Sequence, residues 1–186
     1  MAASCSSSSS AGACGSILQS TADQLLLEVK REAEESGSIS EDLVSALLFV
    51  FQAPLHQALD LLDRGSVTRY YCTAGRELYR VRGSGGRFYT CLTSSDYCSC
   101  PSFVYTVLVK QDSLLCKHLL AVQLGRALSA GARGHVGSRE GEEEGKSSSL
   151  PTVDEVCVTD EEFGRMLMIA SGEMDTTVPP GGEGPR

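Results

Sequence analysis

The first half of the chain repeats apolar residues with the period of an α-helix. Large apolar side chains recur three or four positions apart over residues 18–33, 43–51 and 55–62. Each run is followed within a few residues by glycine or proline, which end helices, and Ser40 can cap the start of the second. We therefore predict three amphipathic helices within residues 17–65.

After the third run the apolar period becomes that of a strand. Residues 67–72, 77–82 and 87–92 are rich in β-branched and aromatic side chains, and short glycine-containing segments separate them. This pattern predicts an antiparallel meander of three strands. A helical turn is expected over residues 103–110, and a further helix over residues 117–129.

Charge is distributed unevenly along the chain, whose formal net charge is −8. Residues 1–63 carry two basic and nine acidic side chains, and residues 131–186 carry five basic and twelve acidic ones. The middle block, residues 64–130, carries nine basic and three acidic side chains. Because exposed charges more than about 8 Å apart are screened in physiological salt, this block can meet a nucleic acid although the whole chain is acidic.

The sequence lacks the apolar runs that membranes and export require. No run approaches the roughly 18–20 apolar residues that span a bilayer. Residues 1–16 are rich in Ser, Ala and Gly, without the basic and apolar segments of a secretory signal. The eight cysteines are therefore expected to be thiols or metal ligands and not disulfides. These features favour the nucleus or the cytosol, and we expect a nuclear protein, with the cytoplasm as a further location, and no membrane partner.

Four residues with metal-ligand chemistry form two closely spaced pairs. The pattern is C-x-C, then 15 residues, then C-x-H, and in an extended chain residues i and i+2 point to the same side. Three thiolates and one imidazole match a closed tetrahedral zinc site, and sulfur ligands favour zinc over magnesium or calcium. The alternative is four buried core residues without a metal. The candidate ligands are Cys98, Cys100, Cys116 and His118.

The second pair restricts where the following helix begins. Residues i and i+2 of a regular helix point about 200° apart, so Cys116 and His118 can share one ion only if the helix begins between them. Asp112 and Ser113 would cap the helix earlier, and the two signals conflict. We give precedence to the metal. Lys117, between the two ligands, can offset the negative charge of a three-thiolate site.

The finger motif resembles that of a known family. With Ala121 three residues after His118, the chain reads C-x-C…C-x-H-x-x-A, which is similar to the signature of SWIM-type zinc fingers in the Shu-complex family. The resemblance covers residues 18–130 and the short helix predicted after Thr159, whereas the Ser-rich start and the acidic insert depart from it. The similar stretches outside the ligand pairs are residues 57–64, 89–92 and 115–122.

The resemblance implies a function that spacing and composition do not provide. In that family the protein pairs with a RecA-like recombinase paralogue and promotes the recombinase filament on single-stranded DNA in homologous recombination repair. It further implies one structural zinc ion, and a packing role for Ala121, whose small side chain would let the helix lie close to the finger. Two rivals stay open: an independent DNA-binding finger, as in transposase-like SWIM proteins, and a SWIM-type substrate adaptor of a ubiquitin ligase.

Arginines alternate with aromatic residues along the predicted hairpins. Such a strand face can contact phosphates and stack bases, or it can be a solvated outer face whose aromatic side chains turn into the core. We favour the core for the aromatics and leave both alternatives open for the arginines. The candidate DNA contacts are Arg76, Arg80, Arg82 and Arg87.

Catalytic motifs find little support in the sequence. The glycines within residues 83–86 link two predicted strands, and no Lys-Ser/Thr of a phosphate-binding loop follows them. A catalytic zinc keeps one position open for water, whereas four side chains close this site. We expect no enzyme activity, no catalytic residue and no small-molecule substrate.

The predicted fold is α+β, with N-terminal helices, a three-stranded antiparallel meander and a zinc-organised SWIM finger with a following helix. A capping box of Thr159 and Glu162 predicts one more helix. The apolar stripe of the first helix, with Leu25 and Val29, either completes the core or forms an interface. The expected segments are a disordered Ser-rich tail (1–16), a helical region (17–65), the meander and finger (66–130, finger core 89–130), an acidic flexible linker (131–158), a C-terminal helix (159–171) and a disordered tail (172–186).

Overall fold

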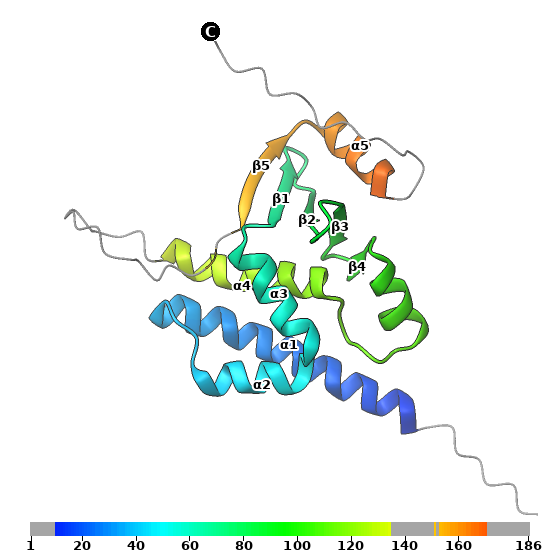
Figure 1. Ribbon diagram of the computed structural model, residues 1–186. Helices are drawn as coiled ribbons and strands as arrows, with labels where there is room; N and C mark the ends of the chain where they lie inside the picture. Colours follow the sequence, from blue (N-terminus) through cyan, green and yellow to red (C-terminus); the bar gives the residue numbers. More distant parts are fainter. Residues whose placement is uncertain (1–9, 135–150, 152, 171–186) are drawn as a thin grey trace, which may run out of the picture.

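The computed structural model describes residues 10–134, 151 and 153–170. These residues form an α+β fold in which a five-stranded mixed sheet lies on a layer of helices, with one more helix on the opposite face of the sheet (Figure 1). The predicted fold class is therefore confirmed. No helix in the described part of the chain is long and apolar enough to cross a membrane.

The three predicted N-terminal helices are present as α1 (Ser10–Ser36), α2 (Glu41–Phe51) and α3 (Ala53–Asp63). Ser40 caps α2 as expected, since its hydroxyl oxygen accepts a hydrogen bond of 3.3 Å from the backbone N–H of Leu43. A single residue, Gln52, turns the chain between α2 and α3, because its backbone adopts a positive φ of 54°. The helices therefore follow each other closely.

Helix α1 begins earlier than predicted. The tail was expected to reach residue 16, but the helix starts at Ser10, so residues 10–16 belong to it. Extending an existing helix costs less than starting one, so the helix can continue through this segment although its two glycines offset the high helix propensity of its two alanines. The rest of the predicted tail, residues 1–9, lies outside the described residues.

The meander is confirmed with bounds that differ from the prediction by at most one residue. Strands β1 (Val67–Cys72), β2 (Glu77–Arg82) and β3 (Phe88–Leu92) pair antiparallel in sequence order. A short strand β4 (Tyr97–Cys98) continues the sheet beyond β3. It brings the first predicted zinc ligand to the sheet edge, with Cys98 opposite Cys91.

The predicted linker over residues 131–158 is wrong at both ends. Helix α4 (Lys117–Gly134) runs past the predicted stop, and strand β5 (Asp154–Val158) pairs parallel with β1, which gives the sheet the order β4-β3-β2-β1-β5. A parallel partner can be distant in sequence, so no turn signal announces it. Two ion pairs of Arg69, to Glu77 on β2 and to Glu155 on β5, hold the acidic strand in place.

Both remaining helical predictions are confirmed. The turn after the first cysteine pair is a π-helix, η1 (Phe103–Val109), and α5 (Asp160–Ala170) follows β5. The predicted capping box is formed, because the N–H of Glu162 donates to the Thr159 hydroxyl at 3.2 Å and the N–H of Thr159 donates back to the Glu162 carboxylate at 3.0 Å. The predicted C-terminal tail, residues 172–186, lies outside the described residues.

Helix α4 is at the centre of the structure. It packs against α1 and α3 on one side and against the sheet on the other (Figure 1). Residues 119–122 of α4 are all fully buried. On α1, Val29 is 1% exposed and Leu25 packs against the same core, so the apolar stripe completes the core rather than forming an interface. A smaller cluster joins Phe163 of α5 to Cys72 and Leu78 on the opposite face of the sheet.

Candidate metal centre

The four predicted zinc ligands converge at one point. Two come from β4 and the residues that follow it, one precedes α4, and one lies in its first turn. All four side chains are buried, and their ligand atoms lie within 4.8 Å of one another. A tetrahedral ion with Zn–S bonds near 2.3 Å needs sulfur–sulfur separations of about 3.8 Å, which this cluster accommodates. The four residues, Cys98, Cys100, Cys116 and His118, form a site for one zinc ion.

The start of α4 shows how the C-x-H pair can share that ion. The helix begins at Lys117, between the two ligands, as the metal required. Cys116 stands just outside the helix, and its carbonyl accepts the first helical hydrogen bond, from the N–H of Leu120 at 3.0 Å. Asp112 does not cap α4, because it lies in the non-helical connection between η1 and α4.

His118 provides the test of whether the residues fit a metal. Its imidazole is 3% exposed, yet neither Nδ1 nor Nε2 has a hydrogen-bond partner among the described residues. Burying a polar atom without a partner costs about 1–3 kcal/mol, so such atoms call for an explanation. A zinc ion bonded to one nitrogen supplies it. The ring is held in place by Tyr89, whose centroid lies 4.5 Å away.

Hydrogen bonds around the sulfurs support the ligand geometry. The backbone N–H of Phe103 donates to Cys100 Sγ at 3.2 Å, and the thiol of Cys91 donates to Cys98 Sγ at 3.5 Å. Such outer contacts orient ligands and stabilise thiolate charge. Cys91 is a fully buried core residue, and sequence reasoning missed its contact with a ligand. The signal was available in principle, because Cys91 faces Cys98 once β3 and β4 are paired.

The sulfurs are close enough to compete for protons when no cation is present. Hydrogen bonds from the thiols of Cys116 and Cys98 lower the pKa of Cys100 far below that of an ordinary thiol. Hydrogen bonds to Cys100 correspondingly raise the pKa values of Cys98 and Cys116. Without a metal, negative charge is therefore favoured on Cys100 over its two neighbours. A zinc ion allows all three cysteines to be thiolates, because each anionic sulfur then bonds to the cation.

Ala121 is fully buried one turn after His118. We expect Ala121→Leu to destabilise the fold by about 1–3 kcal/mol, because a larger side chain overpacks a closed interior. Zinc content should stay at one ion per chain. Chemical denaturation measures the stability, and Ala53→Leu, at an exposed alanine, is the matched control. Equal stability of the two variants would show that position 121 tolerates a large side chain and would contradict the packing role of Ala121.

The candidate DNA contacts separate into two groups. Arg76 forms an ion pair of 3.2 Å with Asp160, and its guanidinium lies over the ring of Phe163. Arg80 lies over the ring of Phe88, 4.7 Å from its centroid. The two remaining candidates flank the turn between β2 and β3, close to α3 and α4. These two, Arg82 and Arg87, form no ion pair with the described residues.

The aromatic residues of the hairpins also divide. Tyr79 is 1% exposed and belongs to the core, as the sequence analysis predicted for the aromatic side chains of the hairpins. Phe88 is 52% exposed on the outer face, so the core expectation is wrong for this ring. Alternation along β3 explains the difference, since Tyr89 points to the helical layer and its neighbour must point away.

The chain is similar to a known family and to known proteins. A family model described as SWIM zinc finger matches residues 79–123. The chain is 50% identical over 114 residues to Zinc finger SWIM domain-containing protein 7 of Danio rerio, covering 61% of this chain and 81% of that protein. The Homo sapiens protein of the same name is 45% identical over 112 residues, which cover 60% of this chain and 80% of the human one. No solved structure matches the chain.

The relatives extend beyond vertebrates. The Zinc finger SWIM domain-containing protein 7 homolog of Dictyostelium discoideum is 36% identical over 105 residues, covering 56% of this chain and 67% of that protein. The match to the family model contains all four buried ligands and Ala121. Because the chain has a closed Cys₃His site and is this similar to its relatives over most of their length, it belongs to the zinc finger SWIM domain-containing protein 7 family.

Proposed function

We propose that the protein is a non-catalytic zinc-finger adaptor that acts in the nucleus. It pairs with a RecA-like recombinase paralogue and promotes the recombinase filament on single-stranded DNA in homologous recombination repair. The family resemblance supplies the identity of the partner. The chemistry of the site supports a structural role for the metal, because four side chains occupy the tetrahedral positions and leave none for a reactive water.

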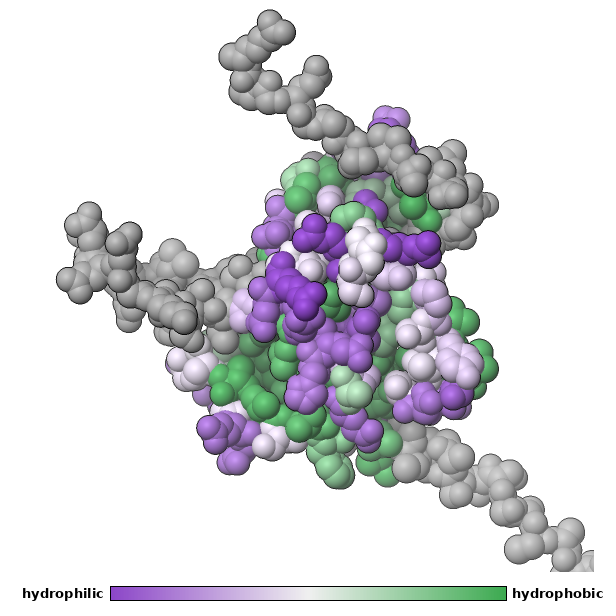
Figure 2. Space-filling view, in the orientation of Figure 1, coloured by the Kyte–Doolittle hydropathy of each residue, from purple (hydrophilic) through white to green (hydrophobic). Residues whose placement is uncertain are grey.

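The observation that carries an adaptor role is the exposed apolar surface of η1. Apolar side chains exposed together on a small domain mark contacts with other proteins, because water is a poor environment for them. Four of the seven η1 residues are large, apolar and at least half exposed, and Figure 2 shows hydrophobic residues at the right-hand edge of the molecule, where η1 lies. These residues, the η1 patch, are Val104, Tyr105, Leu108 and Val109.

The zinc centre and the η1 patch are physically linked. The segment from Pro101 to Leu115 joins the two ligand pairs, so η1 lies within the loop that the metal closes. Phe103 anchors its start: its side chain is 5% exposed, its ring lies 5.8 Å from that of Tyr97, and its N–H donates to Cys100 Sγ. A π-helix is a rare conformation that is frequent at functional sites. The zinc ion thus fixes the surface that the partner would cover.

The η1 patch gives a direct test of the adaptor role. We expect Val104→Glu with Leu108→Glu to abolish co-purification of a RecA-like ATPase with the tagged full-length chain, identified by mass spectrometry. Zinc content and circular dichroism should not change, since both side chains are at least 50% exposed. Phe49→Glu on α2 is the matched control, because this ring is 83% exposed and far from η1 in sequence.

Three results would contradict the proposal in different ways. Capture that survives the double substitution would place the partner elsewhere than the η1 patch. Recovery of ubiquitin-ligase subunits, with no RecA-like ATPase, would favour the substrate-adaptor alternative. Wild-type protein that binds DNA tightly but captures no ATPase would favour the independent DNA-binding finger.

A further inference from the structure

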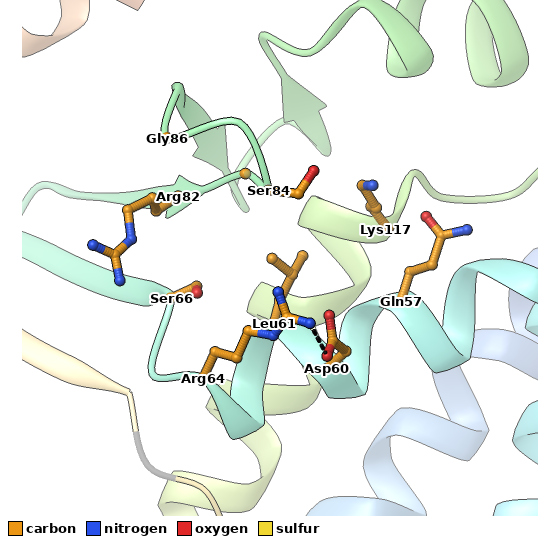
Figure 3. Close-up of a pocket in the computed structure, with 10 residues that line it drawn as sticks. Gln57, Asp60, Leu61, Arg64, Ser66, Arg82, Ser84, Gly86 and Lys117 are labelled. Atoms are coloured by element: carbon orange, nitrogen blue, oxygen red, sulfur yellow. Dashed lines mark ion pairs between the residues drawn. The ribbon is translucent and has the colours of Figure 1, made fainter.

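A basic pocket lies where α3, the β2–β3 turn and α4 meet. Its volume is about 460 Å³, and Figure 3 shows Ser84 and Lys117 on the side opposite Arg64 and Leu61. A second pocket of about 400 Å³ adjoins it, since the two share Gly83, Ser84 and Lys117. Elements distant in sequence therefore build one continuous depression beside the zinc centre. In Figure 2, hydrophilic residues gather over α3 and the strands next to it.

The charges around the two pockets are predominantly positive. Four cationic side chains line them, and the single carboxylate in the linings, Asp60, is paired with Arg64 at 2.8 Å. A zinc ion with three thiolates and one imidazole has a net charge of −1. After Asp60 and the zinc centre are counted, a net charge of +2 remains. The four cations are Arg64, Arg82, Arg87 and Lys117.

Three of these cations are available to a ligand. Arg82, Arg87 and Lys117 form no ion pair with the described residues, and the first two are exposed. Ser66 and Ser84 add hydroxyl groups to the lining of the first pocket. Guanidinium, ammonium and hydroxyl groups are the donors that contact phosphate oxygens in protein–DNA complexes. The pocket thus has the chemistry of a phosphate site.

A single strand fits this surface better than an isolated phosphate. The two adjoining pockets offer places for successive phosphates, and Phe88, half exposed on the outer face of the sheet, is opposite Arg82 in the β2–β3 register. Proteins that hold single strands combine a basic groove with aromatic rings on which bases stack. Arg76 pairs with Asp160 of α5, and Arg80 lies over the ring of Phe88. These two arginines are therefore assigned to local packing and not to phosphate contact.

We infer that the paired pockets bind the phosphodiester backbone of single-stranded DNA through Arg82, Arg87 and Lys117. The inference rests on the proposed role of the protein on single strands and names the surface that would contact them. It also divides the four arginines that the sequence singled out, assigning DNA contact to two of them and local packing to the other two.

Salt dependence of DNA binding tests this site with the full-length chain. Affinity for a fluorescein-labelled oligothymidylate is measured by anisotropy over a range of salt concentrations. Each phosphate contact contributes about −0.7 to the slope of log affinity against log salt for single strands. Arg82→Gln with Arg87→Gln should flatten the slope by about 1.4 and weaken binding about 25-fold at about 0.1 M salt, if the affinities converge near 1 M. Arg76→Gln with Arg80→Gln removes the same charge and should leave the slope unchanged.

A second variant tests the site without removing any cation. Ser84→Glu places a carboxylate in the shared lining and should also weaken binding, whereas Thr73→Glu, at the exposed β1–β2 turn, should not. Unchanged binding of both pocket variants, equal losses in both controls, or tighter binding of a duplex of the same length would overturn the inference. Capture of the RecA-like ATPase should persist in all variants, so a failure of this site is distinguishable from a failure of the adaptor role.

Discussion

We expect His118→Ala to lose the zinc ion and to unfold the finger core. Zinc binding to finger peptides is worth about 10–16 kcal/mol, as much as or more than the roughly 5–15 kcal/mol of stability of a typical domain. The same residue is 3% exposed, so the substitution also leaves a cavity beside Tyr89. Elemental analysis should find well under one zinc per chain, and circular dichroism should show loss of β-structure. Chelation of zinc from the wild-type protein should produce the same change.

His56 provides the matched control for that experiment. It is an exposed histidine on α3, outside the four-residue cluster, so His56→Ala should keep one zinc and the wild-type melting temperature. A His118→Ala protein that keeps its fold and its zinc would show that the imidazole is not a ligand. A variant that keeps its fold and loses only the zinc would show that the metal is dispensable for stability.

The second large effect is expected at the seam between α1 and α4. Val29 is 1% exposed, and Val29→Asp would bury a carboxyl group without a partner. Keeping an aspartate neutral at pH 7, about 3 units above its ordinary pKa, costs about 4 kcal/mol. The lost apolar contacts add to that cost, so the variant should be unfolded or nearly so at 25 °C.

Leu27 is the control on the same helix, two residues away and 67% exposed. Leu27→Asp should change stability by no more than about 0.5 kcal/mol, as is usual at exposed sites. Urea denaturation of both variants gives the comparison. If Val29→Asp folds normally and instead loses the protein partner, the α1 stripe is an interface, as the alternative interpretation of the sequence held.

Those parts of the fold whose signals are local could be predicted from the sequence. Helix α2 ends shortly before Pro54, α3 ends shortly before Gly65 with its positive φ of 57°, and glycine turns separate the meander strands, so bounds could be placed closely. The start of α4 followed from the chemistry of the metal, which decided between two conflicting helix signals. The four ligands were identified because their spacing is set by coordination and not by the rest of the fold.

The parts that were missed depend on contacts between distant residues. Strand β5 pairs parallel with β1, whose residues are 86 positions earlier in the chain, so its acidic sequence resembled a linker. The grouping of the arginines depended on Asp160, which only the folded chain brings near Arg76, and on α3 and Lys117, which only the folded chain brings into one pocket with Arg82. The role of Cys91 similarly required the register of β3 and β4.

X-ray absorption at the zinc edge tests the central claim most directly. The wild-type protein should contain one zinc per chain, and the spectrum should fit three sulfurs near 2.3 Å and one nitrogen near 2.0–2.1 Å. Cys100→Ser, if it retains metal, should show two sulfurs. Folded wild-type protein without zinc, or a first shell with an oxygen from water in place of one side chain, would contradict a closed structural site of Cys98, Cys100, Cys116 and His118.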